Sequence, residues 1–125
     1  MRILLLDPEA PAGLVSFSKL RDAEELNPTG SIDTDIRAFI HASATLLREK
    51  PERFQIRLYR CIPSVNLFRI DGEMFWGPYL IRDQSRNLPT FLVREGPLFD
   101  RLERHFDDIW SSDAFSRPVP HEWLK

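Results

Sequence analysis

Between residues 57 and 79 the chain carries polar and charged side chains whose types suit the binding of a small ligand. Arginines form charge-assisted hydrogen bonds to phosphate oxygens, and serine, asparagine, aspartate and tyrosine hydrogen-bond polar groups of a nucleotide-like molecule. The predicted ligand-binding residues are Arg57, Ser64, Asn66, Arg69, Asp71 and Tyr79.

Each of these residues also has a purely structural interpretation. Asp71 precedes Gly72, and an Asp-Gly pair favours a tight hairpin turn. Ser64 and Asn66 follow Pro63 as turn-forming residues. The two arginines fit exposed positions of strands. Both interpretations remain open from the sequence alone.

The spacing in this region resembles the catalytic half of the phospholipase D superfamily. In that family a strand leads into a His-x-Lys-x-x-x-x-Asp motif. Ser64 stands where the family has its nucleophilic histidine, Asn66 where it has its lysine, and Asp71 at its aspartate. Neutral serine and asparagine cannot form a phosphohistidine bond and also neutralise phosphate charge. The resemblance therefore implies that no residue is catalytic.

Further segments extend the resemblance. Gly77 matches the glycine of the family's later Gly-Ser-x-Asn motif, whereas Pro78 and Leu80 replace the serine and asparagine. Residues 4–8 and 106–110 are similar to regulatory domains found C-terminal to bacterial helix-turn-helix proteins. The resemblance implies a ligand-sensing or dimerising regulatory module that forms a homodimer. It also implies that an earlier strand and helix of that family are missing before residue 3.

Two other functions remain open. One is a weak phosphodiesterase or nuclease with an altered active site, in which His41 or His105 replaces the lost histidine. The other is a protein-interaction domain that uses the aromatic C-terminal half, since the chain has nine phenylalanines and three tryptophans. No histidine pair has the i, i+4 spacing of a helical metal site, so no metal is expected. The absence of a glycine-rich phosphate loop predicts no nucleotide cofactor.

Composition narrows the class of protein. Seventeen basic and nineteen acidic residues give a net charge of −2, which argues against direct DNA binding. Cys61 is the single cysteine, so an internal disulfide is excluded and a buried structural thiol is favoured. No apolar run approaches the roughly 20 residues of a membrane span, and a cytoplasmic protein is expected.

The elements that must position the candidate residues follow from hydrophobic periodicity. Residues 3–6 and 54–61 predict buried strands, and helical crossovers between them favour a parallel pair. Residues 67–76 predict a hairpin around Asp71-Gly72. The remaining predicted elements are a partly helical segment over 11–26, a turn over 27–30, a helix from Ser31 or Asp33 to residue 50, a polar loop over 84–89, a strand over 90–94 and a helix from residue 97.

Together these elements predict an α/β fold with a mixed, partly parallel sheet and flanking helices. A single domain is expected over residues 1–112. Residues 113–125 contain two prolines and lose periodicity, so they predict a C-terminal tail that Trp123 docks.

Overall fold

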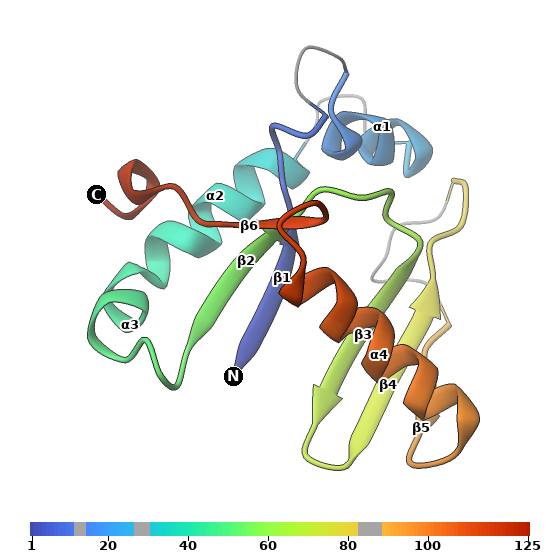
Figure 1. Cartoon of the computed structure of the whole chain (residues 1–125). Coiled ribbons are helices and arrows are strands. Elements are labelled where there is room, and N and C mark those ends of the chain that lie inside the picture. Colours follow the sequence, from blue (N-terminus) through green and yellow to red (C-terminus); the bar gives the residue numbers. More distant parts are fainter. Residues whose placement is uncertain (12–14, 27–30, 83–88) are drawn as a thin grey trace.

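The computed structural model has an α/β fold in which the strands form two small sheets of three strands each (Figure 1). It describes residues 1–11, 15–26, 31–82 and 89–125. The turn expected at 27–30 and most of the loop expected at 84–89 lie outside these ranges. The prediction of one sheet is corrected to two, because no ladder joins the parallel strands to the hairpin.

The first sheet confirms the mixed, partly parallel arrangement. Strand β1 (Arg2–Leu6) pairs in parallel with β2 (Gln55–Tyr59), with Leu4 opposite Arg57. Strand β6 (Ser116–Pro118) pairs antiparallel with the other edge of β2. The alternation of Ile56 and Leu58 with polar residues sets β2 so that its apolar side faces the core.

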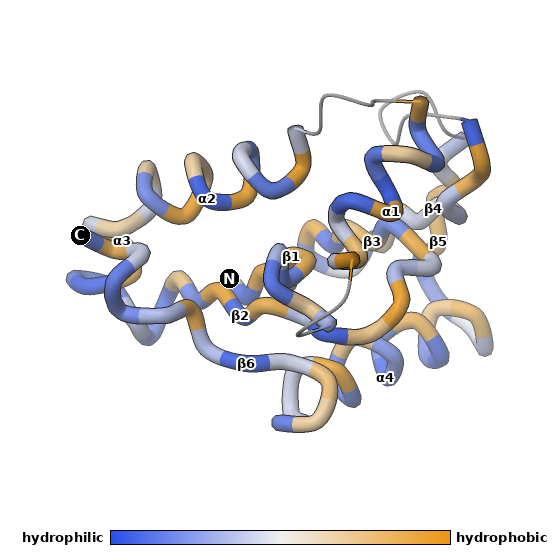
Figure 2. Tube along the Cα trace, turned by 90° about the horizontal axis from the view of Figure 1, so that it is seen from above, coloured by the Kyte–Doolittle hydropathy of each residue, from blue (hydrophilic) through white to orange (hydrophobic). Residues whose placement is uncertain are grey.

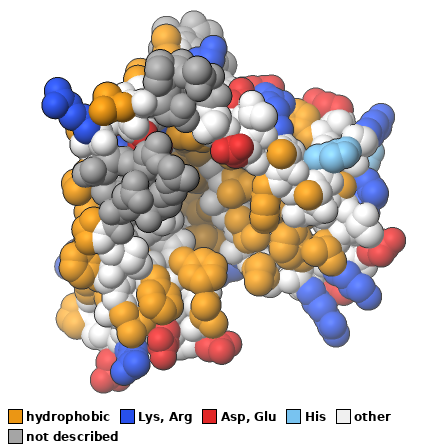
Figure 3. All heavy atoms as spheres, turned by 180° about the vertical axis from the view of Figure 1, so that it is seen from behind, with side chains coloured by type: hydrophobic (Ala, Val, Ile, Leu, Met, Phe, Trp, Pro, Cys, Tyr) orange, Lys and Arg blue, Asp and Glu red, His pale blue; other side chains and the backbone are white. Residues whose placement is uncertain are grey.

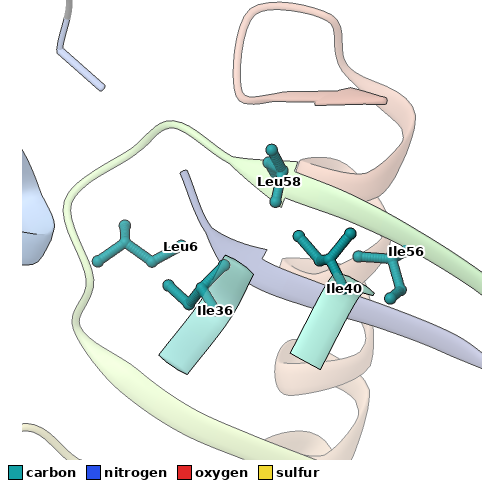
Figure 4. Close-up of a cluster of buried hydrophobic side chains, with 5 residues drawn as sticks. All are labelled: Leu6, Ile36, Ile40, Ile56 and Leu58. Atoms are coloured by element: carbon teal, nitrogen blue, oxygen red, sulfur yellow. The ribbon is translucent and has the colours of Figure 1, made fainter. Parts of the chain in front are cut away.

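Helices α1 (Phe17–Glu24), α2 (Ile32–Ala42) and α3 (Ala44–Glu49) lie in the crossover between the parallel strands. Ile36 and Ile40 of α2 pack on the first sheet in the main buried cluster, which comprises Leu6, Ile36, Ile40, Ile56 and Leu58 (Figure 4). The single helix expected to residue 50 is interrupted at Ser43. Phe39 of α2 is exposed.

The second sheet is fully antiparallel. Strand β3 (Val65–Ile70) forms the predicted hairpin with β4 (Glu73–Pro78), and β5 (Phe91–Val93) pairs with β4. Asp71 has a φ of 52°, so this residue supplies the positive angle that reverses the chain. The Asp-Gly signal therefore predicts both the position and the two-residue length of this turn.

Helix α4 (Pro97–Ser111) spans the same side of both sheets (Figures 1 and 2). Near its end, Asp107 accepts a hydrogen bond of 3.0 Å from Arg2 of β1. In its first half, Glu103 accepts from Arg69 of β3. Figure 2 shows α2 on the opposite side of the layer of strands from α4. One helix thus holds the two sheets in a common layer.

Residues 113–125, expected as a tail, contribute β6 and a short 3₁₀ helix, η2 (His121–Leu124). Arg117 of β6 donates two hydrogen bonds to the fully buried carboxylate of Asp7, at 2.6 and 2.9 Å. Trp123 packs against the main core and lies beneath the guanidinium groups of Arg37 and Arg117. These contacts tie the segment to the first sheet. Within the described ranges, no helix is long and apolar enough to cross a membrane.

Candidate functional site

In the described part of the chain, one side of the second sheet is covered by α4, and on the other side Phe68, Ile70 and Leu92 are exposed. Strand side chains alternate between the two sides, so Arg69 and Met74 face α4 while Phe68 and Phe75 face away from it. We call this second side the open face, and it consists of Asn66, Phe68, Ile70, Glu73, Phe75 and Leu92.

The centre of the open face is apolar and exposed. Phe68 is 59% exposed, Ile70 52% and Leu92 45%. Figure 3 shows the molecule from the side opposite α4, with hydrophobic side chains gathered over this part of the chain. Grouped exposed apolar side chains on a small protein mark an interaction site more often than single ones do.

A pocket of about 470 Å³ opens at the hairpin end of this face. Its lining combines apolar groups with charges of both signs, and it comprises Ile70, Asp71, Gly72, Glu73, Phe75 and Arg94. Arg94 Nε lies 3.6 Å from Glu73 Oε1, and both side chains are largely exposed. The pocket contains one of the six residues predicted from sequence, Asp71.

The six residues predicted to bind a ligand do not lie together in the structure. Ser64 and Tyr79 extend the hairpin by one main-chain hydrogen bond of 3.1 Å, and Asn66 lies beside them opposite Gly77. Asp71 lies at the other end of β3, which at about 3.4 Å per residue puts it roughly 24 Å from Ser64. Three of the six are thus neighbours, and Asp71 is remote from them.

The two predicted arginines serve structural contacts. Arg57 lies in the first sheet, where its guanidinium donates to the hydroxyl and carbonyl of Ser116, at 2.9 Å each. Arg69 faces α4, pairs with Glu103, and its guanidinium lies 5.2 Å from the centre of the Phe99 ring. Neither guanidinium lies on the open face with Asn66.

Tyr79 belongs to a polar cluster that the sequence did not indicate. The Arg21 guanidinium of α1 lies 4.6 Å from the centre of the Tyr79 ring, and Arg21 also donates to the Leu80 carbonyl at 3.1 Å. The side chains of Tyr59 and Tyr79 share a hydrogen bond. Burial raises the pKa of both tyrosines, while Arg21 opposes the increase at each. The sequence placed Tyr59 only by alternation, which puts it on the side of β2 that Ile56 and Leu58 do not occupy.

Tyrosine ionisation tests this cluster. The chain has two tyrosines, and a free tyrosine is half ionised at about pH 10. Because both folded pKa values are raised, phenolate absorbance is expected to remain low at about pH 10 in native protein and to appear there after unfolding in urea. The unfolded chain then loses protons that the folded chain keeps, so stability falls as pH rises above about 10. A native titration matching the unfolded one would contradict the cluster.

The residues of the alternative functions are dispersed. His41 is on α2 and His105 on α4, and both are exposed. Cys61 is half-buried, and burial raises the pKa of its thiol. In the described part of the chain, no group of three or more histidine, cysteine, aspartate or glutamate residues is placed to hold a metal ion.

The residues of the candidate site that the sequence did not indicate are Phe68, Phe75, Leu92 and Arg94. The period-two alternation of the hairpin predicts that these side chains lie on one side of a sheet. It does not predict which side of the sheet a helix covers. Comparison with protein-family models, with curated proteins and with solved structures found no match.

Proposed function

We propose that this chain is a non-catalytic, phospholipase D-like regulatory module that acts by pairing with a second copy through the open face. The observation that supports this proposal is the exposed apolar centre formed by Phe68, Ile70 and Leu92. A sheet side that carries phenylalanine, isoleucine and leucine gains free energy when a second surface removes it from water.

Charge at the margin of the face suits a second copy. Glu73 and Arg94 lie side by side at the hairpin end and are both substantially exposed. If the two-fold axis of the dimer passes between Glu73 and Arg94, then Arg94 of each copy lies next to Glu73 of the other copy. An isologous contact of this kind uses one patch twice and needs no other partner.

The size of the face sets the expected strength of association. Strands of six residues spaced about 4.8 Å apart give a footprint of roughly 20 by 14 Å. This footprint is smaller than the roughly 800 Å² that each partner contributes to a standard stable interface. The dimer is therefore expected to be weak and to depend on protein concentration.

The dimerising part of the regulatory role has more support than the ligand-sensing part. A phosphate-containing ligand would use Arg94 in the pocket, but Asp71 and Glu73 line the same pocket and oppose its negative charge. Arg57 and Arg69 are engaged in contacts away from it.

Replacing Phe68 by glutamate tests the proposal. Sedimentation velocity over a range of protein concentrations is expected to show dimer in the native chain and monomer in Phe68→Glu. The reason is that a charge at the centre of the interface would be buried without a partner. The expected loss of dimer affinity is about ten-fold or more.

Phe115→Glu is the matched control, because Phe115 is 50% exposed but lies beside β6 in the other sheet. Both variants should unfold near the temperature of the native chain, since both changes are at exposed positions. A native chain that is monomeric at every concentration, or a Phe68→Glu variant that dimerises as well as Phe115→Glu, would overturn the proposal.

A further inference from the structure

Each of the two sheets ends in a strand that is paired on one side only, and these two unpaired edges face each other. Each sheet has two such edge strands, and the two that face each other are β1 of the first sheet and β3 of the second. Figure 1 shows them as neighbours that run in opposite directions, and Figure 2 shows both sheets in one layer. No ladder and no described hydrogen bond joins them.

The register identifies which main-chain groups of β1 point to the gap. Gln55 N donates to Met1 O and Asp7 N donates to Tyr59 O, so odd-numbered residues bond toward β2. In a parallel strand the residues between them point the other way. The N–H and C=O groups of Leu4 and Leu6 therefore face β3, and within the described ranges they have no hydrogen-bond partner. Leu6 is 6% exposed, which makes unpaired groups there costly.

The same argument applies to β3. Tyr79 N donates to Ser64 O, so even-numbered residues bond toward β4. In an antiparallel strand the alternate residues point outward, and these are Val65, Leu67 and Arg69. The described hydrogen bonds include none to their main-chain groups. Two rows of free donors and acceptors thus face one gap.

Helix α4 closes one side of this gap and leaves the other side open. It is bound to β1 through Arg2 and Asp107 and to β3 through Arg69 and Glu103. Figure 3 shows the opposite side of the molecule hollowed between its two halves. Arg2 and Arg69, the described cations bound to α4 at the gap, are each matched by a carboxylate. A binding partner therefore needs no charge of its own there.

We infer that β1, β3 and α4 form a receptor for one extended, uncharged strand of a partner polypeptide, which joins the two sheets into one. Only a polypeptide backbone offers donors and acceptors along both of its edges at the spacing of a strand. Because β1 and β3 run in opposite directions, the strand is parallel to one and antiparallel to the other. This binding uses sheet edges rather than the open face, so it goes beyond the proposed dimer.

The surroundings define the side chains of the partner strand. Its neighbours in β1 are leucines and isoleucine, and those in β3 include Val65 and Leu67. A central strand with apolar neighbours on both sides is rich in valine and isoleucine along its whole length. Charged or proline-containing segments are excluded, since proline lacks the N–H and an unpaired buried charge is costly.

The inference is tested by fusing a donor strand to the full chain. The donor strand has six residues of alternating valine and isoleucine, and a flexible glycine-serine linker joins it to the N-terminus. The linker holds the donor strand at a millimolar effective concentration near β1 and β3. Residue-resolved amide hydrogen exchange is expected to slow about ten-fold or more at Leu4, Leu6, Val65, Leu67 and Arg69 together. A fusion with proline at alternate donor positions is the control, and it should leave all five amides unprotected.

If only the amides of β1 are protected, the donor strand has formed a simple hairpin with β1. If the amides of neither strand are protected, β1 and β3 do not bind a strand. Either result overturns the inference. The same outcome follows if the five amides are already protected in the native chain, since the edges would then not be free. The fusion is also made in the Phe68→Glu background. Loss of dimer with retained protection of both strands separates strand binding from the proposed dimer.

Discussion

Replacing Asp7 by asparagine is expected to lower the free energy of unfolding by about 3 kcal/mol, the lower end of the range for breaking a buried ion pair. Asp7 is fully buried at the end of β1. Its carboxylate accepts two hydrogen bonds from Arg117 and one from the Glu9 main chain, and Arg60 Nε lies 3.5 Å away. Loss of the carboxylate leaves the arginines without their shared partner.

The partial exposure of the arginines is the reason for choosing the lower end of that range. The Arg117 side chain is 28% exposed, so water compensates part of the lost interaction. Glu9 also remains beside Arg117 at 3.0 Å. For a chain of this size the loss corresponds to a fall in the midpoint of thermal unfolding of about 10 °C. Urea denaturation measures the same change in free energy.

Asp108→Asn is the matched control, because Asp108 is exposed on α4. It is expected to change stability by less than about 0.5 kcal/mol. A double-mutant cycle with Arg117→Gln should show coupling, since the two residues are in direct contact. A stable Asp7→Asn variant, or strict additivity with Arg117→Gln, would contradict the role of this pair in fixing β6.

Local patterns were sufficient to predict most of the elements. The apolar run of β1 and the alternation of β2 identify buried strands, and the crossover between them predicts their parallel pairing. The Asp-Gly pair marks the hairpin because Asp71 takes the positive φ of the turn, which few residue types accept. In each of these cases a signal of a few residues decides the local conformation.

Elements held by distant contacts were not predictable in this way. Strand β6 has three residues, one of them Pro118, and its conformation depends on Arg117 reaching Asp7 across 110 positions of sequence. The break at Ser43 likewise follows no proline or glycine in the sequence. Packing rather than propensity selects such elements, so a local pattern cannot reveal them.

The candidate site shows the same limit. Linear spacing places Ser64, Asn66 and Asp71 within eight residues, yet an extended strand separates the first two from the third. Arg57 and Arg69 are on strands as expected, but each points to a partner that comes much later in the chain, Ser116 and Glu103. Which side of the hairpin is open depends on where α4 lies, and that is a tertiary property.

Gly77→Ala is expected to destabilise the fold by about 2–3 kcal/mol, within the range for forcing extra volume into a packed position. A Cβ at this position would overlap the carbonyl oxygen of Pro89, closer than real atoms approach. The obstacle is main chain, so it cannot rotate away as a side chain would. Either β4 or the segment leading into β5 has to move, and the pairing of Trp76 with Phe91 is lost with it. Thermal unfolding followed by circular dichroism measures the change.

Gly72→Ala is the control within the same hairpin, because a Cβ at Gly72 meets no atom within 4 Å and its φ is not positive. Its effect is expected to be within about 0.5 kcal/mol. The contrast between two glycines only five positions apart isolates the contact with Pro89 from the general loss of glycine flexibility. Pro89 lies against Gly77 and so bounds the open face at the end remote from Asp71. If the two variants are equally stable, the contact with Pro89 is absent, and the open face extends past Gly77.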